Sequence, residues 1–255
     1  MKRSNGAGPA CDAPGAARSM RVRRGQRRLA MAWRVQGGRG RAGPSGMPVA
    51  RSNESEVTDM WVVKIGGSLS HDPSLRDWLT QLWEVGGGRV VIVPGGGDFA
   101  DSVRVYQQEW QFDDLAAHNM CLLAMTQYAL MMQAVLPDLV LATSEELIRR
   151  ALRHGKVAVW MPVSLMRVTP NSMTNWDTTS DSLAAWLSTS LNAERLMVVK
   201  SCPVGANVPL GTLASDGVID ASFVRYVKEA NYEVELFSKT DVALVRDRLL
   251  NASAV

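Results

Sequence analysis

The chain has 255 residues, 46% of them hydrophobic, and a formal net charge of +3. Its length and composition are typical of a globular protein with a sizeable core, organised as one α/β domain or two small ones. Its three cysteines lie far apart and outside any CxxC or His-rich spacing, so the sequence indicates neither a zinc site nor a disulfide framework. A reducing cytoplasm is the simplest setting for such a chain.

The charge is unevenly distributed along the chain. Residues 1–59 hold 12 Lys and Arg against 4 Asp and Glu, which leaves residues 60–255 mildly acidic. An acidic body gives no support to a nucleic-acid-binding surface on the fold itself.

The first 59 residues consist largely of Arg, Gly, Ala, Pro and Ser and show no apolar periodicity. We therefore predict that residues 1–59 form a disordered basic extension and that residues 60–255 form a single domain. Three explanations of the extension stay open: a basic arm for an anionic partner, an Arg-rich transit peptide, or an upstream start codon wrongly assigned in a GC-rich gene. The third is favoured because GC-rich codons supply these residue types and Met60 immediately precedes the first apolar segment.

From Met60 onward, strand-like and helix-like segments alternate, which is typical of a parallel α/β sheet. Strands are predicted over residues 61–65, 89–93, 139–142, 157–161, 196–200 and 233–237. Helices are predicted over residues 73–85, 99–108, 113–136, 143–154, 180–192, 221–230 and 240–251. The fourth helix opens with Thr143-Ser-Glu-Glu146, which fits a capping box.

The longest apolar stretch runs from Leu115 to Leu136. It is interrupted by polar side chains at His118, Asn119, Gln127 and Gln133. We therefore predict a largely buried helix here rather than a membrane span.

Two buried-strand patterns run directly into consecutive glycines. Trp61-Val-Val-Lys-Ile65 is followed by Gly66-Gly-Ser68, and Val90-Val-Ile-Val93 is followed by Pro94-Gly-Gly-Gly-Asp98. Open α/β sheets bind ligands at the carboxyl ends of their strands, and glycine lets backbone N–H groups approach an anion closely. Lys64 is costly to place in an apolar strand unless its ammonium group meets a partner, and a phosphate at the strand end would be one.

Two further residues complete a candidate site. Asp181 stands at the start of a predicted helix, where an N-cap is the simplest local role, and Lys200 ends an apolar strand, where a surface lysine explains it equally well. The motif G-x-x-x-x-G-K-[ST] does not occur, which excludes a P-loop. Together these residues describe a site for phosphoryl transfer without a covalent intermediate. Lys64, Lys200 and the glycine N–H groups would offset phosphoryl charge, and Asp181 would hold the lysines or a magnesium ion in place.

Three motifs resemble, in this order and spacing, those of the amino acid kinase superfamily. They are Val62-Val-Lys-Ile-Gly-Gly-Ser-Leu69, Val93-Pro-Gly-Gly-Gly97 and Thr179-Ser-Asp-Ser-Leu-Ala-Ala185. The resemblance implies a three-layer αβα sandwich around a mostly parallel sheet, with ATP over its carboxyl-terminal half and the phosphate acceptor over the other half. It also implies ATP and Mg²⁺ as cofactors.

By the same resemblance, Lys64 matches the lysine that stabilises the transferring phosphoryl group, and Asp181 matches the aspartate that organises the catalytic lysines, here Lys64 and Lys200. The implied nucleotide-binding residues are Gly66, Gly67, Ser68 and Lys200. The implied acceptor-binding residues are Gly95, Gly96, Gly97 and Asp98. No metal-ligating residue of the protein is assigned.

The segment Ala117-His-Asn-Met-Cys-Leu-Leu-Ala-Met-Thr-Gln-Tyr128 is most similar to a narrower group, the kinases of methanofuran biosynthesis and their relatives in methylotrophic bacteria. This implies phosphorylation of a phosphomonoester, aminomethylfuran-methyl phosphate. A uridylate or amino acid kinase of the same fold stays open, because side chains from several loops set the acceptor pocket. A non-catalytic nucleotide- or oxyanion-binding relative also stays open, because Lys200-Ser-Cys-Pro-Val-Gly-Ala206 replaces the Asp-Gly turn of many members. The expected partners are a small-molecule phosphate acceptor and further copies of the chain in a homo-oligomer, with no nucleic acid and no membrane.

Overall fold

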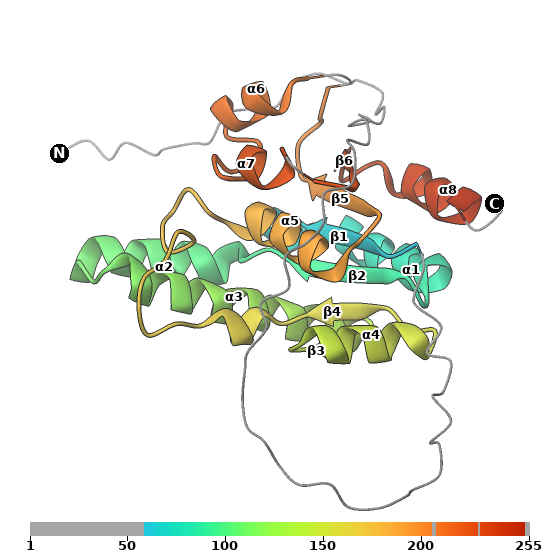
Figure 1. The fold of residues 1–255 in the computed structure, drawn as a ribbon, viewed down its shortest axis with the longest axis horizontal. Coiled ribbons are helices and arrows are strands. Elements are labelled where there is room, and N and C mark those ends of the chain that lie inside the picture. Colours follow the sequence, from blue (N-terminus) through green and yellow to red (C-terminus); the bar gives the residue numbers. More distant parts are fainter. Residues whose placement is uncertain (1–58, 206–207, 229, 253–255) are drawn as a thin grey trace, which may run out of the picture.

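The computed structural model describes residues 59–205, 208–228 and 230–252 (Figure 1). Its centre is a sheet of six parallel strands in the order β3-β4-β2-β1-β5-β6. The strands are β1 (Trp61–Ile65), β2 (Val90–Pro94), β3 (Val140–Ala142), β4 (Ala158–Trp160), β5 (Arg195–Lys200) and β6 (Glu233–Ser238). The six predicted strands are all present, with ends that differ from the prediction by one residue at most. The predicted basic extension, residues 1–59, lies outside the described residues except for Asp59.

Helices cover both faces of the sheet, so the predicted three-layer αβα sandwich is confirmed (Figure 1). The helices are α1 (Ser74–Gly86), α2 (Gly97–Trp110), α3 (Asp114–Val135), α4 (Glu145–Arg153), α5 (Ser180–Leu191), α6 (Leu210–Ser215), α7 (Phe223–Val227) and α8 (Val242–Ala252). Two short 3-10 helices are η1 (Gly67–Leu69) and η2 (Pro162–Leu165). Within the described ranges, no helix is long and apolar enough to cross a membrane.

The side chains of β1 alternate between the two cores of the molecule. Val62 belongs to the core that contains α5, whereas Trp61, Val63 and Ile65 pack in the other core against α1 and α8. All five residues of the strand are buried. Because both faces of a parallel sheet are covered, its central strands read as continuous apolar runs. The one charged residue of the strand, Lys64, therefore lies within the protein on the α5 side.

Two local predictions are corrected by the structure. α4 begins after Ser144, whose hydroxyl accepts a hydrogen bond from the Leu147 N–H (3.2 Å). The predicted capping box from Thr143 to Glu146 is therefore wrong, because the N-cap lies one residue later and the glutamate falls at the second helical position. The helix predicted over 221–230 is confined to α7, and α6 was not predicted.

The turns that follow β1 and β2 pack backbone against backbone. The Gly66 N–H donates to a carbonyl of β5 (3.2 Å), and the Gly95 N–H donates to a carbonyl of β1 (2.9 Å), so both residues extend the sheet into the turns. A Cβ atom on Gly67 would lie 2.2 Å from the nitrogen of Gly97, which is far inside contact distance. Glycine is therefore required at Gly67 for the two turns to touch.

Replacing Gly67 with Ala should lower the free energy of unfolding by about 1–3 kcal/mol, because the added methyl group forces two backbone segments apart. Gly211 in α6 is a matched control, since a Cβ atom there would meet nothing within 4 Å. Gly211→Ala should be neutral or slightly stabilising, because alanine is the better helix former. Urea unfolding measures both effects, and equal stabilities of the two variants would contradict the tight contact between the turns.

Candidate active site

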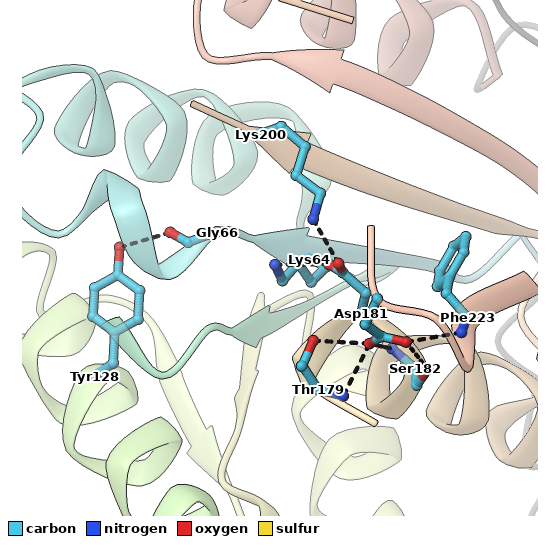
Figure 2. A network of polar contacts seen from close by, with 9 residues as sticks. Lys64, Gly66, Tyr128, Thr179, Asp181, Ser182, Lys200 and Phe223 are labelled. Carbon is cyan, nitrogen blue, oxygen red and sulfur yellow. Dashed lines mark hydrogen bonds and ion pairs between the residues drawn. The ribbon is translucent and has the colours of Figure 1, made fainter. Parts of the chain in front are cut away.

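Lys64 and Lys200 converge on the carboxylate of Asp181 (Figure 2). Lys64 Nζ lies 2.8 Å from Oδ1, and Lys200 Nζ donates a hydrogen bond to Oδ2 at 2.5 Å. The side chains are buried, with exposed fractions of 6% for Lys64, 12% for Lys200 and 4% for Asp181. Each oxygen of the carboxylate thus lies within ion-pair distance of an ammonium group, although Oδ1 makes no hydrogen bond within the described residues, and the cluster carries one net positive charge.

The register of the sheet explains why these side chains meet. β1 and β5 are neighbours, with Lys64 opposite Val198. Lys200 is two residues further along β5, so it projects from the same face of the sheet as Lys64 and closer to the carboxyl edge. α5 packs over β1 on this face, and Asp181 is the second residue of that helix. Thr179 holds the N-cap position, so Asp181 does not take the capping role that its local sequence favours.

Burial and the neighbouring charges shift the pKa values of Asp181 and Lys200. Burial by itself would raise the pKa of Asp181, but the two neighbouring ammonium groups outweigh it and hold the pKa at about 2. Burial, followed by the charge of Lys64, lowers the pKa of Lys200 to about 8, although Asp181 acts in the opposite direction. The carboxylate is therefore ionised at neutral pH, and an anion placed beside the ammonium groups would offset the remaining positive charge.

A cavity of about 240 Å³ lies between the two glycine turns, α2, α3 and the start of α5. At the turns, its wall is made of Gly67, Ser68, Gly96 and Gly97. Backbone N–H groups at the first positions of a helix have no acceptor within that helix, so those at the starts of η1 and α2 can donate to an anion. Ser180, the neighbour of Asp181 in the chain, lines the same cavity, whereas Lys64, Asp181 and Lys200 do not line it themselves.

The residues predicted to contact phosphates divide into two groups in the structure. The N–H groups of Gly66 and Gly95 are taken up by the sheet, and neither residue lines the cavity, whereas the other glycines of both turns do line it. Asp98, predicted to bind the acceptor, is exposed and pairs with His71 instead of lining the cavity. The cavity lining therefore begins two residues after the end of each strand, at Gly67 after β1 and at Gly96 after β2.

Asp220, which the sequence analysis did not single out, organises the start of α5. Its Oδ2 accepts hydrogen bonds from the Thr179 N–H (2.9 Å), the Thr179 hydroxyl (2.8 Å) and the Ser182 N–H (3.0 Å). Its Oδ1 accepts from the Phe223 N–H (2.8 Å) and the Ser182 hydroxyl; Figure 2 shows these donors grouped below Asp181. Asp220 thus caps α5 and α7 together. Its position just before a predicted helix indicated only a local cap.

The described residues provide no protein-based magnesium site. No group of three or more His, Cys, Asp and Glu side chains among them could hold a metal ion. Asp181 has both oxygens on ammonium groups, so the geometry fits its role of holding the lysines and does not fit that of a metal ligand. Phosphate oxygens and water are the usual ligands of Mg²⁺ beside nucleotides, so the ion would be bound through the nucleotide.

Comparison with known proteins identifies the family. The model of the amino acid kinase family matches residues 59–203, which is more than half of the chain. The chain therefore belongs to the amino acid kinase family, and the resemblance that its motifs carry is confirmed.

The individual relatives share little sequence identity with the chain. [5-(Aminomethyl)furan-3-yl]methyl phosphate kinase from Methanocaldococcus jannaschii is 26% identical over 140 residues, which are 54% of this chain and 64% of the relative. The match thus spans less than two thirds of that relative's length. Uridylate kinase from Archaeoglobus fulgidus has a TM-score of 0.57 and 17% identity over 74% of this chain and 95% of its own. UMP kinase from Bacillus anthracis has a TM-score of 0.57 and 14% identity over 76% of this chain and 92% of its own. These two structures show the shared fold.

Replacing Asp220 with Ala should destabilise the starts of α5 and α7, because two backbone N–H groups of the first and one of the second lose their acceptor. We expect the free energy of unfolding to fall by about 1–3 kcal/mol. Asp220→Asn should recover part of this, since the amide oxygen still accepts hydrogen bonds. Asp216→Ala removes an exposed carboxylate from the same segment and serves as the control. Urea unfolding of the full chain measures the differences, and a loss no larger than that of the control would contradict the role assigned to Asp220.

Proposed function

We propose that the protein is an ATP-dependent phosphotransferase that adds a phosphoryl group to an anionic oxygen of a small acceptor. The observation that carries the proposal is the buried pairing of Asp181 with both Lys64 and Lys200, beside a cavity lined by backbone N–H donors. Membership of the amino acid kinase family supports it. ATP supplies the γ-phosphoryl group, and Mg²⁺ accompanies its phosphates.

In the proposed reaction, an acceptor oxygen forms a bond to the γ-phosphorus of ATP while the bond to the β,γ-bridging oxygen breaks and ADP leaves. The ammonium groups of Lys64 and Lys200 offset the charge on the transferring group. Asp181 fixes both ammonium groups in advance, so that little reorganisation is needed when the charge moves. The N–H groups at the cavity wall orient the phosphates, and no side chain of the protein forms a covalent intermediate.

The state of Asp181 favours an acceptor that is already ionised. A carboxylate held between two ammonium groups, with a pKa of about 2, is a poor general base. An alcohol would therefore find no carboxylate base in the lysine cluster to remove its proton. A phosphomonoester is largely a dianion at neutral pH because its second pKa is about 6, so its oxygen can attack without losing a proton.

Among ionised acceptors, we propose a phosphomonoester, and aminomethylfuran-methyl phosphate in methanofuran-type cofactor biosynthesis is the best candidate. The support is the curated relative that phosphorylates this kind of compound. UMP is an alternative acceptor because the chain shares its fold with uridylate kinases, and an amino acid carboxylate is another. A non-catalytic nucleotide- or oxyanion-binding protein is the alternative from a different class, favoured by the loss of the Asp-Gly turn after Lys200.

A homo-oligomer and a cytoplasmic location are also proposals. The first rests on the resemblance to the family and on large apolar side chains exposed along α2 and α3, among them Tyr106, Trp110 and Leu130. The second rests on the cysteine usage. Neither affects the chemistry of the site.

The full-length protein should release ADP from Mg·ATP with aminomethylfuran-methyl phosphate, and much less with UMP, isopentenyl phosphate, aspartate or acetylglutamate. Lys64→Ala should lower kcat roughly 10²- to 10³-fold while nucleotide binding falls much less, because the lysine acts mainly on the transition state. Turnover with another compound of this panel would change the assigned acceptor and leave the enzyme class as proposed. ATP binding without turnover on any acceptor would favour the non-catalytic alternative.

The lowered pKa of Lys200 predicts an alkaline limit on activity. Its ammonium group must keep the proton to offset phosphoryl charge, so kcat/KM should fall as the pH rises through about 8. Lys200→Arg retains a positive charge throughout the accessible range, and the alkaline limb should move above about pH 10. The pH–rate profiles of the two forms measure this. A limb that stays in place in the arginine variant would assign it to a different group.

A further inference from the structure

One face of α3 forms the cavity wall away from the lysine cluster. The helix presents there Asp114, Ala117, His118, Cys121, Leu122 and Met125. Residues spaced by three and four lie on one side of a helix, so this wall is polar at the start of α3 and apolar further along. Later in the same helix, the Tyr128 hydroxyl lies 3.5 Å from the carbonyl of Gly66. The polar end of the wall is therefore the end remote from the first glycine turn.

His118 is an unpaired polar group in this wall. Its side chain is buried, with an exposed fraction of 9% for the residue, and Nε2 has no hydrogen-bond partner among the described residues. Burial, followed by the charge of Arg167, lowers the pKa of His118, so the ring is neutral at pH 7. Buried polar atoms are nearly always hydrogen-bonded in native proteins. An unpaired imidazole nitrogen in a cavity wall therefore points to a ligand atom as its partner.

Asp114, one helical turn before His118, is an unpaired charge in the same wall. Its Oδ1 accepts a hydrogen bond from Gln107 Nε2 (2.9 Å), and no cationic side chain among the described residues pairs with it. The other carboxylate of the wall, Asp101, has the guanidinium of Arg104 at 3.6 Å. With the imidazole neutral, the charges of the lining residues Asp101, Arg104 and Asp114 sum to one negative charge, and the cation Arg167 lies near His118 outside the lining.

The mouth of the cavity is held in a defined shape. Gln107 joins two of its sides, because its Nε2 donates to Asp114 and its Oε1 accepts from Trp176 Nε1 at 2.7 Å. The guanidinium of Arg104 lies over the ring of Trp176, 4.7 Å from its centroid. Asp114, although exposed, is thus held by Gln107 and linked through it to the Trp176 side of the cavity.

We propose that Asp114 and His118 form the subsite for the non-phosphate end of the acceptor, and that this end is a primary ammonium group. The inference rests on the proposed phosphotransferase function. The ammonium group would donate hydrogen bonds to the Asp114 carboxylate and to His118 Nε2 while the acceptor phosphate lies at the glycine turns. Trp176 would cover the apolar body of the acceptor between them. UMP and isopentenyl phosphate carry no such cation, so this subsite discriminates against them.

A matched pair of ligands tests the subsite by calorimetric binding to the full-length protein: aminomethylfuran-methyl phosphate, and the analogue with a hydroxyl group in place of the amine. The amine should bind roughly tenfold or more tightly, because only it satisfies both the charge and the unpaired nitrogen. Asp114→Asn should abolish most of this preference, because the amine loses the charge of its partner and its affinity falls more than that of the hydroxyl analogue. His118→Phe, which retains a ring of similar shape, should also reduce the preference.

Asp113→Asn is the matched control, since it removes the same charge one residue earlier in the chain. Asp113 is the N-cap residue of α3, its side chain accepts from the Ala116 N–H (2.8 Å), and it does not line the cavity. Asparagine also caps helices well, so this variant should fold and retain the preference for the amine.

Several results would overturn the subsite. They are equal affinities of the unaltered protein for the two ligands, binding of neither, a preference that survives in both Asp114→Asn and His118→Phe, or a preference lost equally in Asp113→Asn. Failure of the proposed function is distinguishable from these. Amine-selective binding without ADP release would support the subsite and reject the transferase, whereas ADP release without amine preference would do the reverse.

Discussion

The Asp181 carboxylate between two buried ammonium groups is the interaction on which the rest of the site depends. Removing one partner from a buried ion pair typically costs about 3–5 kcal/mol, because a charge is left without compensation. Here one carboxylate serves both Lys64 and Lys200, so the cluster keeps a net positive charge inside the protein. Phosphate groups beside it would supply the missing negative charge, which couples the stability of the cluster to the binding of its substrates.

The surrounding structure serves to hold that carboxylate in place. The pairing of β1 with β5 brings the lysines to one face and one edge of the sheet, and α5 crosses that face with Asp181 in its first turn. The carboxylate of Asp220 then holds the start of α5 in place. It accepts five hydrogen bonds, four from residues at the start of α5 and one from the first residue of α7. A rigid support of this kind is what electrostatic catalysis requires, since donors that are already aligned need no reorganisation during the reaction.

The cavity separates two tasks along its length. Backbone N–H groups at the glycine turns can donate to any phosphate, whatever else the ligand carries. In this chain they lie where the two glycine turns pack together. In the proposed reaction, the side chains of α3 and of the mouth at Trp176 would decide what else the ligand must carry. One scaffold can therefore host different acceptors while the phosphate chemistry stays the same, and the acceptor is best inferred from α3 rather than from the motifs that define the family.

The sequence by itself determined the six strands, most of the helices, the parallel α/β class and the family. Apolar runs that end in glycine indicate a buried strand followed by a tight turn, and this pattern is local in the sequence. Lys64 within such a run already required an anionic partner. From the sequence, Asp181 could be an N-cap and Lys200 a surface lysine. Only the tertiary structure showed that the two side chains pair with each other instead. It also showed that Asp98 does not line the cavity. Asp220 was found only in the structure, because its partner Thr179 is 41 residues away in the chain. Such pairings depend on strand register and on where a helix crosses the sheet, and no local pattern of residues records either.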